Sequence, residues 1–328
     1  MTGVQTCALP IYTDVGDDEL EAFLADYDVG SLDSFKGIAE GVENSNFLVE
    51  TQRGLYILTL YEKRVKAEEL PFFLGLMDHL AAKGIRCPVP VKGRDGKALR
   101  TLAGRPAAMV TFLKGVWPRK ITPLHCQLLG GAMADFHRAG LDYTSKRANA
   151  LAVAGWKDLF AKVRADADAV VPGLAAEIEA ELGDVEAKWP KALPLGIIHA
   201  DLFPDNVFFL GDALSGIIDF YFACEDFLAY DIAIALNAWC FEPDSSFNVT
   251  KARGLLNAYG KVRPLDPAEL AALPLLARGA ALRFLLTRLY DWLNRAEGAL
   301  VKPKDPREYL KKLRFHRQVK GPEAYGLG

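Results

Sequence analysis

The sequence predicts an α+β fold in two lobes, a small N-terminal lobe built on a mostly antiparallel sheet and a larger, mainly helical C-terminal lobe. Between residues 47 and 113, short apolar runs alternate with turn residues and are interrupted by one helical stretch. From Thr122 onward, apolar residues recur at the spacing of one helix face. We therefore expect an N-terminal nucleotide-binding lobe at 12–113 and a C-terminal catalytic lobe at 114–328.

The N-terminal lobe begins with a short amphipathic helix over 17–27, in which the apolar residues share one face. A second helix is expected at 67–83, and strands at 47–51, 55–61, 98–102 and 107–112. Residues 1–11 follow neither the helical nor the strand period. We predict that they are a foreign prefix rather than part of the fold.

The C-terminal lobe is predicted to be mainly helical. Helices are expected at 123–139, 156–169, 174–189, 232–241, 249–259, 267–277 and 280–293. Within this lobe an apolar strand ends at His199, and two brief strands flank the turn Gly211-Asp212. The polar residues between these strands therefore lie on short loops, where functional side chains are common.

Composition and charge limit the kinds of partner. The 328 residues are 51% hydrophobic and 25% charged, as in an ordinary globular protein. With 39 Lys and Arg against 42 Asp and Glu, the net charge of −3 offers no basic field for nucleic acid or membrane, so we expect a small-molecule substrate. The apolar runs are too short to span a membrane, and no signal-peptide pattern is present. Five cysteines without paired metal spacing indicate a reduced, cytoplasmic protein.

The residues most indicative of function lie in the run 197–209 and just after it. His199 and Asp201 follow the first strand, Asn206 comes five residues after Asp201, and Asp219 follows the third strand. This order of His-x-Asp, Asn and Asp-Phe is that of catalytic loops in phosphoryl transfer. Asp201 would accept the proton of a substrate hydroxyl, and Asn206 with Asp219 would hold Mg²⁺ through oxygen atoms.

A simpler interpretation treats the polar residues at 201–206 as a turn around Pro204, and Asp219 as a cap. An isolated Asp and Asn at this spacing would fit it. The full combination, with His199 before the loop and two strands between the loop and Asp219, favours the catalytic interpretation.

A second polar segment, in the N-terminal lobe, could bind phosphates. Gly37 and Gly41, followed by Asn44-Ser45-Asn46, could cover a triphosphate with backbone N–H groups, although the same pattern is typical of a plain hairpin. A lysine that contacts phosphates is expected in the next strand, but Thr59 occupies the corresponding position. Lys63 is the nearest base, and it could equally be a solvated charge.

Three further features bear on the site. Backbone groups of Thr111 and Leu113, at the end of the small lobe, could hold adenine, which is compatible with an ordinary buried strand. Asp231 lies near the start of a helix and could hydrogen-bond back onto the catalytic loop. His125 and His137 are interpreted as packing or surface histidines rather than ligands.

Several stretches together resemble one family over nearly all of 12–316. They are Lys36 to Asn46, Leu58 to Arg64, Leu70 to Leu74, His199 to Asn206, Ala238 to Pro243 and Leu285 to Trp292. The chain resembles the homoserine kinase family of the aminoglycoside-phosphotransferase-like (protein-kinase-like) superfamily. The resemblance implies a two-lobed kinase-like fold that phosphorylates L-homoserine with ATP and Mg²⁺ in threonine biosynthesis. It also implies Asp201 as the base, Asn206 and Asp219 as Mg²⁺ ligands, and 37–46 as the phosphate cover.

The same resemblance implies a pocket for an amino acid, whose carboxylate and ammonium need an arginine and an acid or aromatic residue. The candidates are Trp239, Arg283, Arg288 and Asp291, although both arginines could instead form surface salt bridges. The departure at Thr59 leaves the phosphate-contacting residue open. Two other functions also stay open, a kinase for another small alcohol of the aminoglycoside, choline or methylthioribose type, and a catalytically dead nucleotide-binding module. The oligomeric state is not indicated.

Overall fold

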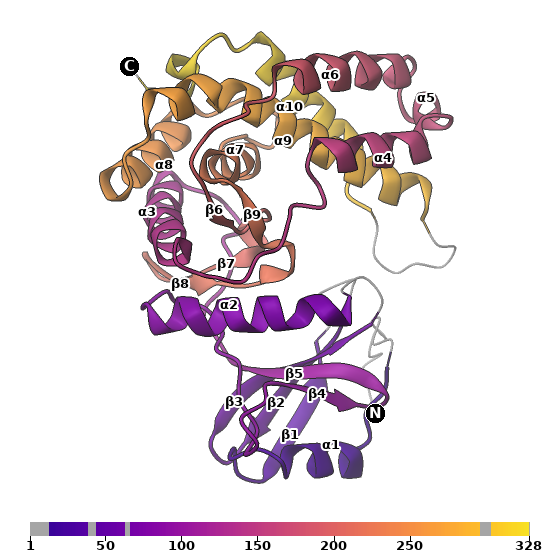
Figure 1. Cartoon of the computed structure of the whole chain (residues 1–328), viewed down its shortest axis with the longest axis vertical. Helices are drawn as coiled ribbons and strands as arrows, with labels where there is room; N and C mark the ends of the chain where they lie inside the picture. The colour runs from indigo at the N-terminus through magenta and orange to yellow at the C-terminus, as the bar shows by residue number, and fades with distance from the viewer. Residues whose placement is uncertain (1–12, 39–43, 63–65, 296–302, 328) are drawn as a thin grey trace, which may run out of the picture. The chain divides into compact units, whose positions relative to one another are not determined.

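The structure is a computed structural model that describes residues 13–38, 44–62, 66–295 and 303–327. It divides the chain into two compact units, Met1–Lys114 and Gly115–Gly328 (Figure 1). The predicted foreign prefix and the candidate residues Gly41 and Lys63 lie outside the described residues.

The first unit is built on a five-stranded antiparallel sheet in the order β1-β2-β3-β5-β4. Its strands are β1 (Leu32–Gly37), β2 (Asn44–Thr51), β3 (Gly54–Tyr61), β4 (Leu99–Leu102) and β5 (Arg105–Thr111). Its helices are α1 (Asp17–Leu24), the short η1 (Ala67–Glu69) and α2 (Leu70–Ala82). A tight turn joins β2 to β3 and pairs Thr51 with Gly54, whose φ of +146° favours glycine.

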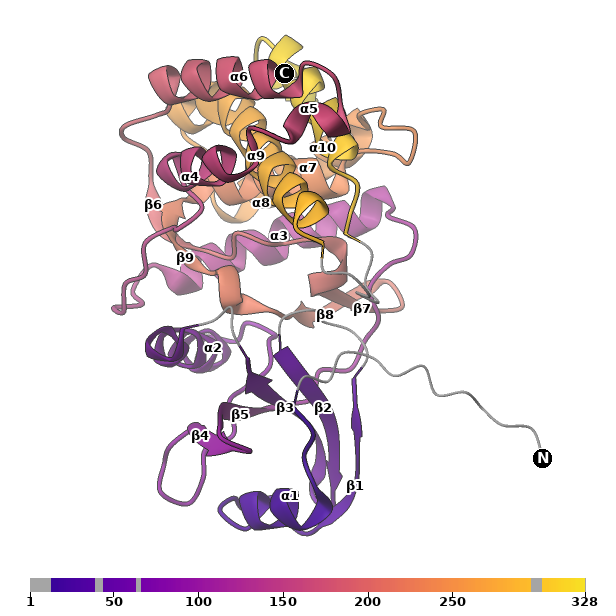
Figure 2. The ribbon, with the colours of Figure 1, turned by 90° about the vertical axis from the view of Figure 1, so that its right-hand side faces the viewer.

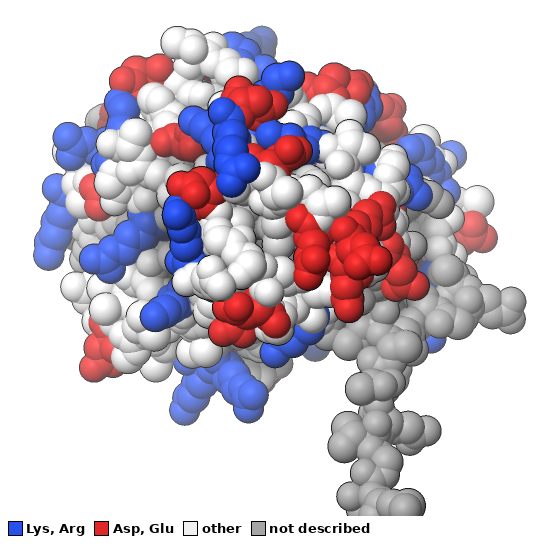
Figure 3. Space-filling model, turned by 90° about the horizontal axis from the view of Figure 1, so that it is seen from below, with Lys and Arg blue, Asp and Glu red and all other residues white. Residues whose placement is uncertain are grey.

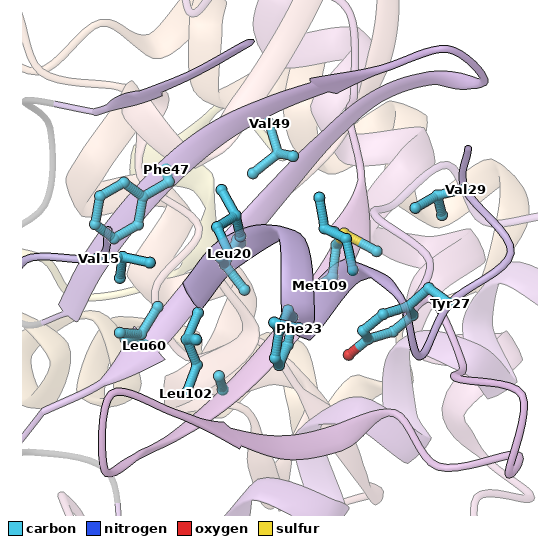
Figure 4. Close-up of a cluster of buried hydrophobic side chains, with 13 residues drawn as sticks. Val15, Leu20, Phe23, Tyr27, Val29, Phe47, Val49, Leu60, Leu102 and Met109 are labelled. Atoms are coloured by element: carbon cyan, nitrogen blue, oxygen red, sulfur yellow. The ribbon is translucent and has the colours of Figure 1, made fainter. Parts of the chain in front are cut away.

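One face of this sheet is covered by α1, as Figure 4 shows. Leu20 and Phe23 of α1 pack in one buried cluster with Phe47, Val49 and Leu60 from the strands. Because side chains alternate along a strand, Asn46 and Thr59 point to the opposite face of the sheet. Asn46 therefore lies on the face away from α1, whereas Ser45, the residue before it, lies on the same face as Phe47.

The second unit is mainly helical. Its helices are α3 (Pro123–Gly140), α4 (Val153–Val163), α5 (Ala167–Val170), α6 (Leu174–Lys188), α7 (Leu228–Trp239), α8 (Val249–Val262), α9 (Pro267–Leu293) and α10 (Pro306–Gln318), with short η2 (Pro204–Asn206), η3 (Phe220–Phe222) and η4 (Pro322–Tyr325). Two small antiparallel sheets pair β6 (Leu195–Ile198) with β9 (Cys224–Phe227), and β7 (Val207–Leu210) with β8 (Ala213–Ile217).

The long helix α9 forms the centre of this unit. It packs against α4, α6, α7 and α10 (Figures 1 and 2). By length and composition α9 could cross a membrane, but 67% of its most apolar window is buried inside the protein, as expected of a core helix.

Net charge is nearly balanced, and Figure 3 shows acidic and basic side chains interspersed over the face in view, with one gathering of acidic side chains.

The close packing of α3 on α8 depends on one glycine. A Cβ added to Gly130 would lie 2.1 Å from the backbone oxygen of Leu255, so a side chain there would push the two helices apart.

The start of α3 is fixed by a capping box, in which Thr122 accepts from the His125 N–H and the His125 ring accepts from the Thr122 N–H.

The predicted α+β class is confirmed, and most predicted elements are present. The prediction of separate helices at 267–277 and 280–293 is wrong, because α9 runs through Pro274 without a break. Burial of its second half on neighbouring helices outweighs the hydrogen bond lost at proline. The helix predicted at 156–169 instead ends at Val163, and β1, β9 and α10 were not predicted.

Candidate active site

The loop after β6 carries His199, Ala200 and Asp201 in an unusual backbone conformation. Ala200 has a φ of +62°, in the left-handed region that disfavours residues other than glycine. The conformation is held by Asp231 of α7, whose carboxylate accepts the N–H groups of His199 (2.9 Å) and Ala200 (2.8 Å). The predicted hydrogen bond from Asp231 to the catalytic loop is thus confirmed.

The carbonyl groups of the same loop are also held by side chains. The carbonyl of Ala200 accepts from the Arg283 guanidinium at 2.7 Å, and that of Leu202 accepts from the Trp239 indole N–H at 2.7 Å. The carbonyl of Asp201 accepts from the Asn206 amide at 2.8 Å. Anchors from α7 and α9 therefore fix the backbone from which the Asp201 side chain projects.

His199 is a buried link between two parts of the site. Its Nε2 lies 2.9 Å from the Ile218 carbonyl, and its Nδ1 accepts the Asp201 N–H at 3.3 Å. Since Nδ1 is an acceptor, Nε2 carries the proton and donates to Ile218. Burial lowers the pKa of His199, which favours the neutral ring. The ring thereby connects the catalytic loop to the residue before Asp219.

Asp201, Asn206 and Asp219 form the polar centre of the site. Asp201 is half-buried, and its carboxylate accepts from the Asn206 amide at 3.1 Å. Burial is the main cause that raises the pKa of Asp201, to about 7, and the negative charge of Asp219 raises it further. The positive charge of Arg283 acts in the opposite direction and lowers this pKa. Asp219 is exposed, and its φ of +63° turns the chain sharply after β8.

This centre has the donor set of a hard divalent cation. The Asn206 amide nitrogen is used on Asp201, so the amide oxygen is the atom left for a metal. Asp219 adds a carboxylate. Across the described residues no group of three or more His, Cys, Asp or Glu could hold a metal. A cation held by one amide and one carboxylate would keep several waters, as Mg²⁺ does.

A buried hydrogen-bond chain supports Asp231 from below. His137 of α3 has Nε2 at 3.1 Å from Asp231 and Nδ1 at 2.7 Å from the Tyr259 hydroxyl. Burial opposes ionisation of Asp231, but hydrogen bonds from His137 and the His199 N–H hold its pKa below the ordinary value. His137 was interpreted as a packing or surface histidine, and it is a fully buried one. Its link to Asp231 carried no local sequence signal.

The four candidate substrate residues fall into two groups. Trp239 is fully buried under Leu202, and Arg283 is buried at Ala200, so both contact the catalytic loop. Arg288 instead forms an ion pair with Glu308 at 2.6 Å. Asp291 is half-buried two residues before the end of α9.

In the first unit, the start of β2 is closely tied to β3. The Thr59 hydroxyl donates to the Asn46 side chain at 2.8 Å, so a neutral pair occupies the position where a lysine was expected. Ser45 donates to Glu62 at 2.8 Å, and the Asn44 side chain accepts the Glu62 N–H at 3.4 Å. Gly37, which ends β1, pairs with Phe47 of β2.

The end of β5 is engaged with the segment before β4. Thr111 donates its N–H to the Val89 carbonyl and accepts the Val89 N–H on its hydroxyl, both at 2.9 Å. Leu113 follows the strand and is half-buried. The hydrogen-bonding groups of Thr111 are therefore partly used within the unit.

Residues 34–265 match the phosphotransferase enzyme family. The chain is 66% identical over 319 residues to the homoserine kinase of Xanthobacter autotrophicus, covering 97% of this chain and 99% of that one. It is 65% identical to the homoserine kinase of Rhodospirillum rubrum, with the same coverage.

The fold matches solved kinases at low sequence identity. An amicoumacin kinase in complex with AMP-PNP, Ca²⁺ and Ami superposes with a TM-score of 0.68 at 17% identity, covering 93% of each chain. An ethanolamine kinase of Plasmodium vivax gives a TM-score of 0.61 at 16% identity, covering 87% of this chain and 82% of that one. The chain thus has the fold of these kinases and belongs to the phosphotransferase enzyme family and, within it, to the homoserine kinases.

Proposed function

We propose that this chain transfers the γ-phosphoryl group of ATP to the hydroxyl of L-homoserine, which yields O-phospho-L-homoserine and ADP in threonine biosynthesis. The observation that carries the reaction type is the rigidly anchored Asp201 beside Asn206 and Asp219. The choice of homoserine follows from relatives named homoserine kinase that are 66% identical over 97% of this chain.

Asp201 acts as the proton acceptor in this proposal. The homoserine oxygen forms the new bond to phosphorus while its proton moves to the Asp201 carboxylate, and the bond from phosphorus to ADP breaks. Burial and the neighbouring Asp219 charge raise the pKa of Asp201, which makes its carboxylate a better proton acceptor than an ordinary aspartate. His199 is fully buried and acts by fixing the Asp201 backbone.

Asn206 and Asp219 would hold Mg²⁺, and the donor set described above fits that ion. When bound, Mg²⁺ neutralises charge on the phosphates. The amide of Asn206 has its orientation set by two hydrogen bonds to Asp201, so the base and the metal ligand are fixed relative to each other.

In the first unit, we assign the nucleotide contacts to the residues that the sequence indicated. Gly37, Asn44, Ser45 and Asn46, together with Gly41, would cover the phosphates through backbone N–H groups and small side chains. Backbone groups near Thr111 and Leu113 would meet adenine. Lys63 remains the candidate cation for the phosphates, since Thr59 is neutral and already bonded to Asn46.

Arg283 is the best supported candidate for the homoserine carboxylate. It is a buried cation beside the catalytic loop and forms no ion pair with a carboxylate in the described parts of the chain. Asp201 and Asp226 are near enough to interact with its charge, but neither forms a direct ion pair with it, and a substrate carboxylate would supply that partner. Arg288 has Glu308 as a counter-ion, and the Trp239 indole N–H is used on Leu202, which makes both weaker candidates. Asp291 stays a candidate for the ammonium group.

An aminoglycoside or choline has no carboxylate to pair with Arg283, so the same observation favours homoserine over these alcohols. The balanced charge and the expected cytoplasmic location agree with a small metabolite as the partner. We therefore keep L-homoserine as the proposed substrate and treat the other alcohols as alternatives for the assay.

The test is a coupled assay of ADP release with L-homoserine, ethanolamine, choline and an aminoglycoside as acceptors. Turnover with L-homoserine well above the other three is expected. The Asp201→Ala variant should lose about 10²- to 10⁴-fold in kcat, the usual contribution of a general base. Asp212→Asn, in the exposed β7–β8 turn, is the matched control and should keep full activity.

Turnover with another alcohol but not with L-homoserine would refute the substrate assignment. An unchanged kcat in the Asp201→Ala variant would refute Asp201 as the base. Binding of Mg²⁺–ATP without turnover of any alcohol would identify a catalytically dead nucleotide-binding module.

A further inference from the structure

Lys304 lies beside the catalytic loop although 99 residues separate it from its partner there. Its Nζ is 3.4 Å from the Asp205 carboxylate and 5.4 Å from the centre of the Phe203 ring. A residue just before α10 thus brings a positive charge to the loop that carries the base.

The contacts of Lys304 contribute little to stability. The side chains of Lys304 and Asp205 are 62% and 52% exposed, and ion pairs this exposed contribute little to stability. An exposed ammonium over an aromatic ring also adds little. These contacts therefore hold the ammonium near the loop without fixing it there.

The surface under Lys304 is better fixed than Lys304 itself. The Phe203 ring packs edge-on against Phe284 of α9 at 4.9 Å, and Tyr309 of α10 lies 6.4 Å away. Phe203 is two residues after Asp201, and its N–H donates to the Asp201 carbonyl at 2.8 Å. The ring therefore forms a platform with a defined position relative to the base.

The loop itself supplies no cation for the reaction. From His199 to Asn206 it contains no lysine or arginine, whereas Asp201, Asp205 and the nearby Asp219 are acidic. Arg283 is buried at the Ala200 carbonyl. Phosphoryl transfer spreads negative charge over the oxygens of the moving group, and lysines or arginines commonly stabilise that charge.

We propose that Lys304 is a further catalytic residue that contacts the phosphoryl group during its transfer. This inference rests on the phosphoryl transfer proposed above. The flexible lysine stem lets the ammonium leave Asp205 for an oxygen of the phosphoryl group. The proton released by the alcohol goes to Asp201, and Lys304 acts only through its charge and hydrogen bonds.

The experiment compares steady-state kinetics of the wild type with Lys304→Ala, Lys304→Arg and the control Lys311→Ala. Lys311 is an exposed lysine on α10 with no ion pair among the described residues. Lys304→Ala should lower kcat by about 10²-fold, the size of effect seen when one transition-state donor is removed. The KM values for ATP and the alcohol should stay within about twofold, because the contact forms mainly in the transition state. Lys304→Arg should recover part of kcat, and Lys311→Ala should match the wild type.

Two results would overturn the proposal. A kcat of Lys304→Ala equal to that of Lys311→Ala would show that the ammonium is not used. A raised KM for L-homoserine with unchanged kcat would show contact with the substrate carboxylate instead. The substrate assignment fails separately, since a wild type that phosphorylates only another alcohol refutes homoserine and allows the same variants to be measured with that alcohol.

Discussion

Replacing Asp231 with asparagine should destabilise the second unit and disable the catalytic loop together. The Asp231 carboxylate accepts N–H groups from His199 and Ala200 and lies 3.1 Å from His137 Nε2. Asparagine has only one oxygen, so its NH₂ group must face one of these two backbone donors. That donor would then be buried without an acceptor.

The expected magnitude follows from these contacts. Hydrogen bonds to charged groups contribute about 1.5–3 kcal/mol each, and one is lost outright while the others lose their ionic component. Asp231 is fully buried, so water cannot replace the lost partner. We expect the free energy of unfolding to fall by about 3–5 kcal/mol, in the range for breaking a buried charged pair.

Urea unfolding followed by circular dichroism measures this change, and kcat is measured on the folded fraction. Asp244→Asn is the matched control, because Asp244 is exposed in a loop and should change stability by less than about 0.5 kcal/mol. A loss below about 1 kcal/mol in Asp231→Asn would refute the role of this carboxylate as the anchor of the loop.

Two further predictions concern stability. Gly130→Ala should cost about 1–3 kcal/mol, because its Cβ would meet the Leu255 backbone oxygen at 2.1 Å, whereas Gly131→Ala meets nothing within 4 Å and should stabilise slightly. Thermal melting of the pair checks this, and equal melting temperatures would contradict it. Burial lowers the pKa of His316 to about 3, so below its unfolded value of about 6.5 only the unfolded chain takes up the proton. Stability should therefore fall as pH drops from about 6.5 towards 3, by roughly 2 kcal/mol at pH 5 from this group. Urea unfolding at pH 7.5 and 5 should show a smaller loss in His316→Gln than in the wild type, and identical losses would exclude His316 as the cause.

The grouping of the candidate site residues was predictable because they are close in sequence. His199, Asp201 and Asn206 lie within one loop, and Asp219 follows after a single hairpin. Such a spacing constrains the geometry before any tertiary contact is known. Helices with a strong apolar period, such as α3, were predicted within one or two residues for the same reason.

Elements that depend on distant partners were harder to predict. The strand β9 is only four residues long and carries two acids, and it becomes a strand by pairing with β6. The helix α10 is rich in charged residues, and burial of a few side chains such as Tyr309 and Leu313 fixes it. The local sequence pattern predicts neither β9 nor α10, because tertiary contacts determine the conformation of both segments.

The salt-bridge alternative is confirmed for Arg288, whereas local reasoning did not indicate the partner of Arg283. Arg283 and Arg288 lie five residues apart on one helix, yet one hydrogen-bonds a backbone carbonyl and the other a glutamate. A backbone carbonyl that binds a side chain cannot be recognised from the sequence, because every residue has a backbone carbonyl. The position of Lys304 beside the catalytic loop could not be predicted for a similar reason, since its partner Asp205 is 99 residues away in the sequence.

The anchors of the catalytic loop also bear on how the chain acquires activity during synthesis. The Ala200 carbonyl is held by Arg283, which is 83 residues later in the chain. At ribosomal speeds of roughly 5–20 residues per second, that anchor is made about 4 to 17 seconds after Ala200 itself. Until α9 has emerged, the Ala200 carbonyl lacks its Arg283 partner. Catalytic competence therefore arises late, when nearly the whole second unit has been translated.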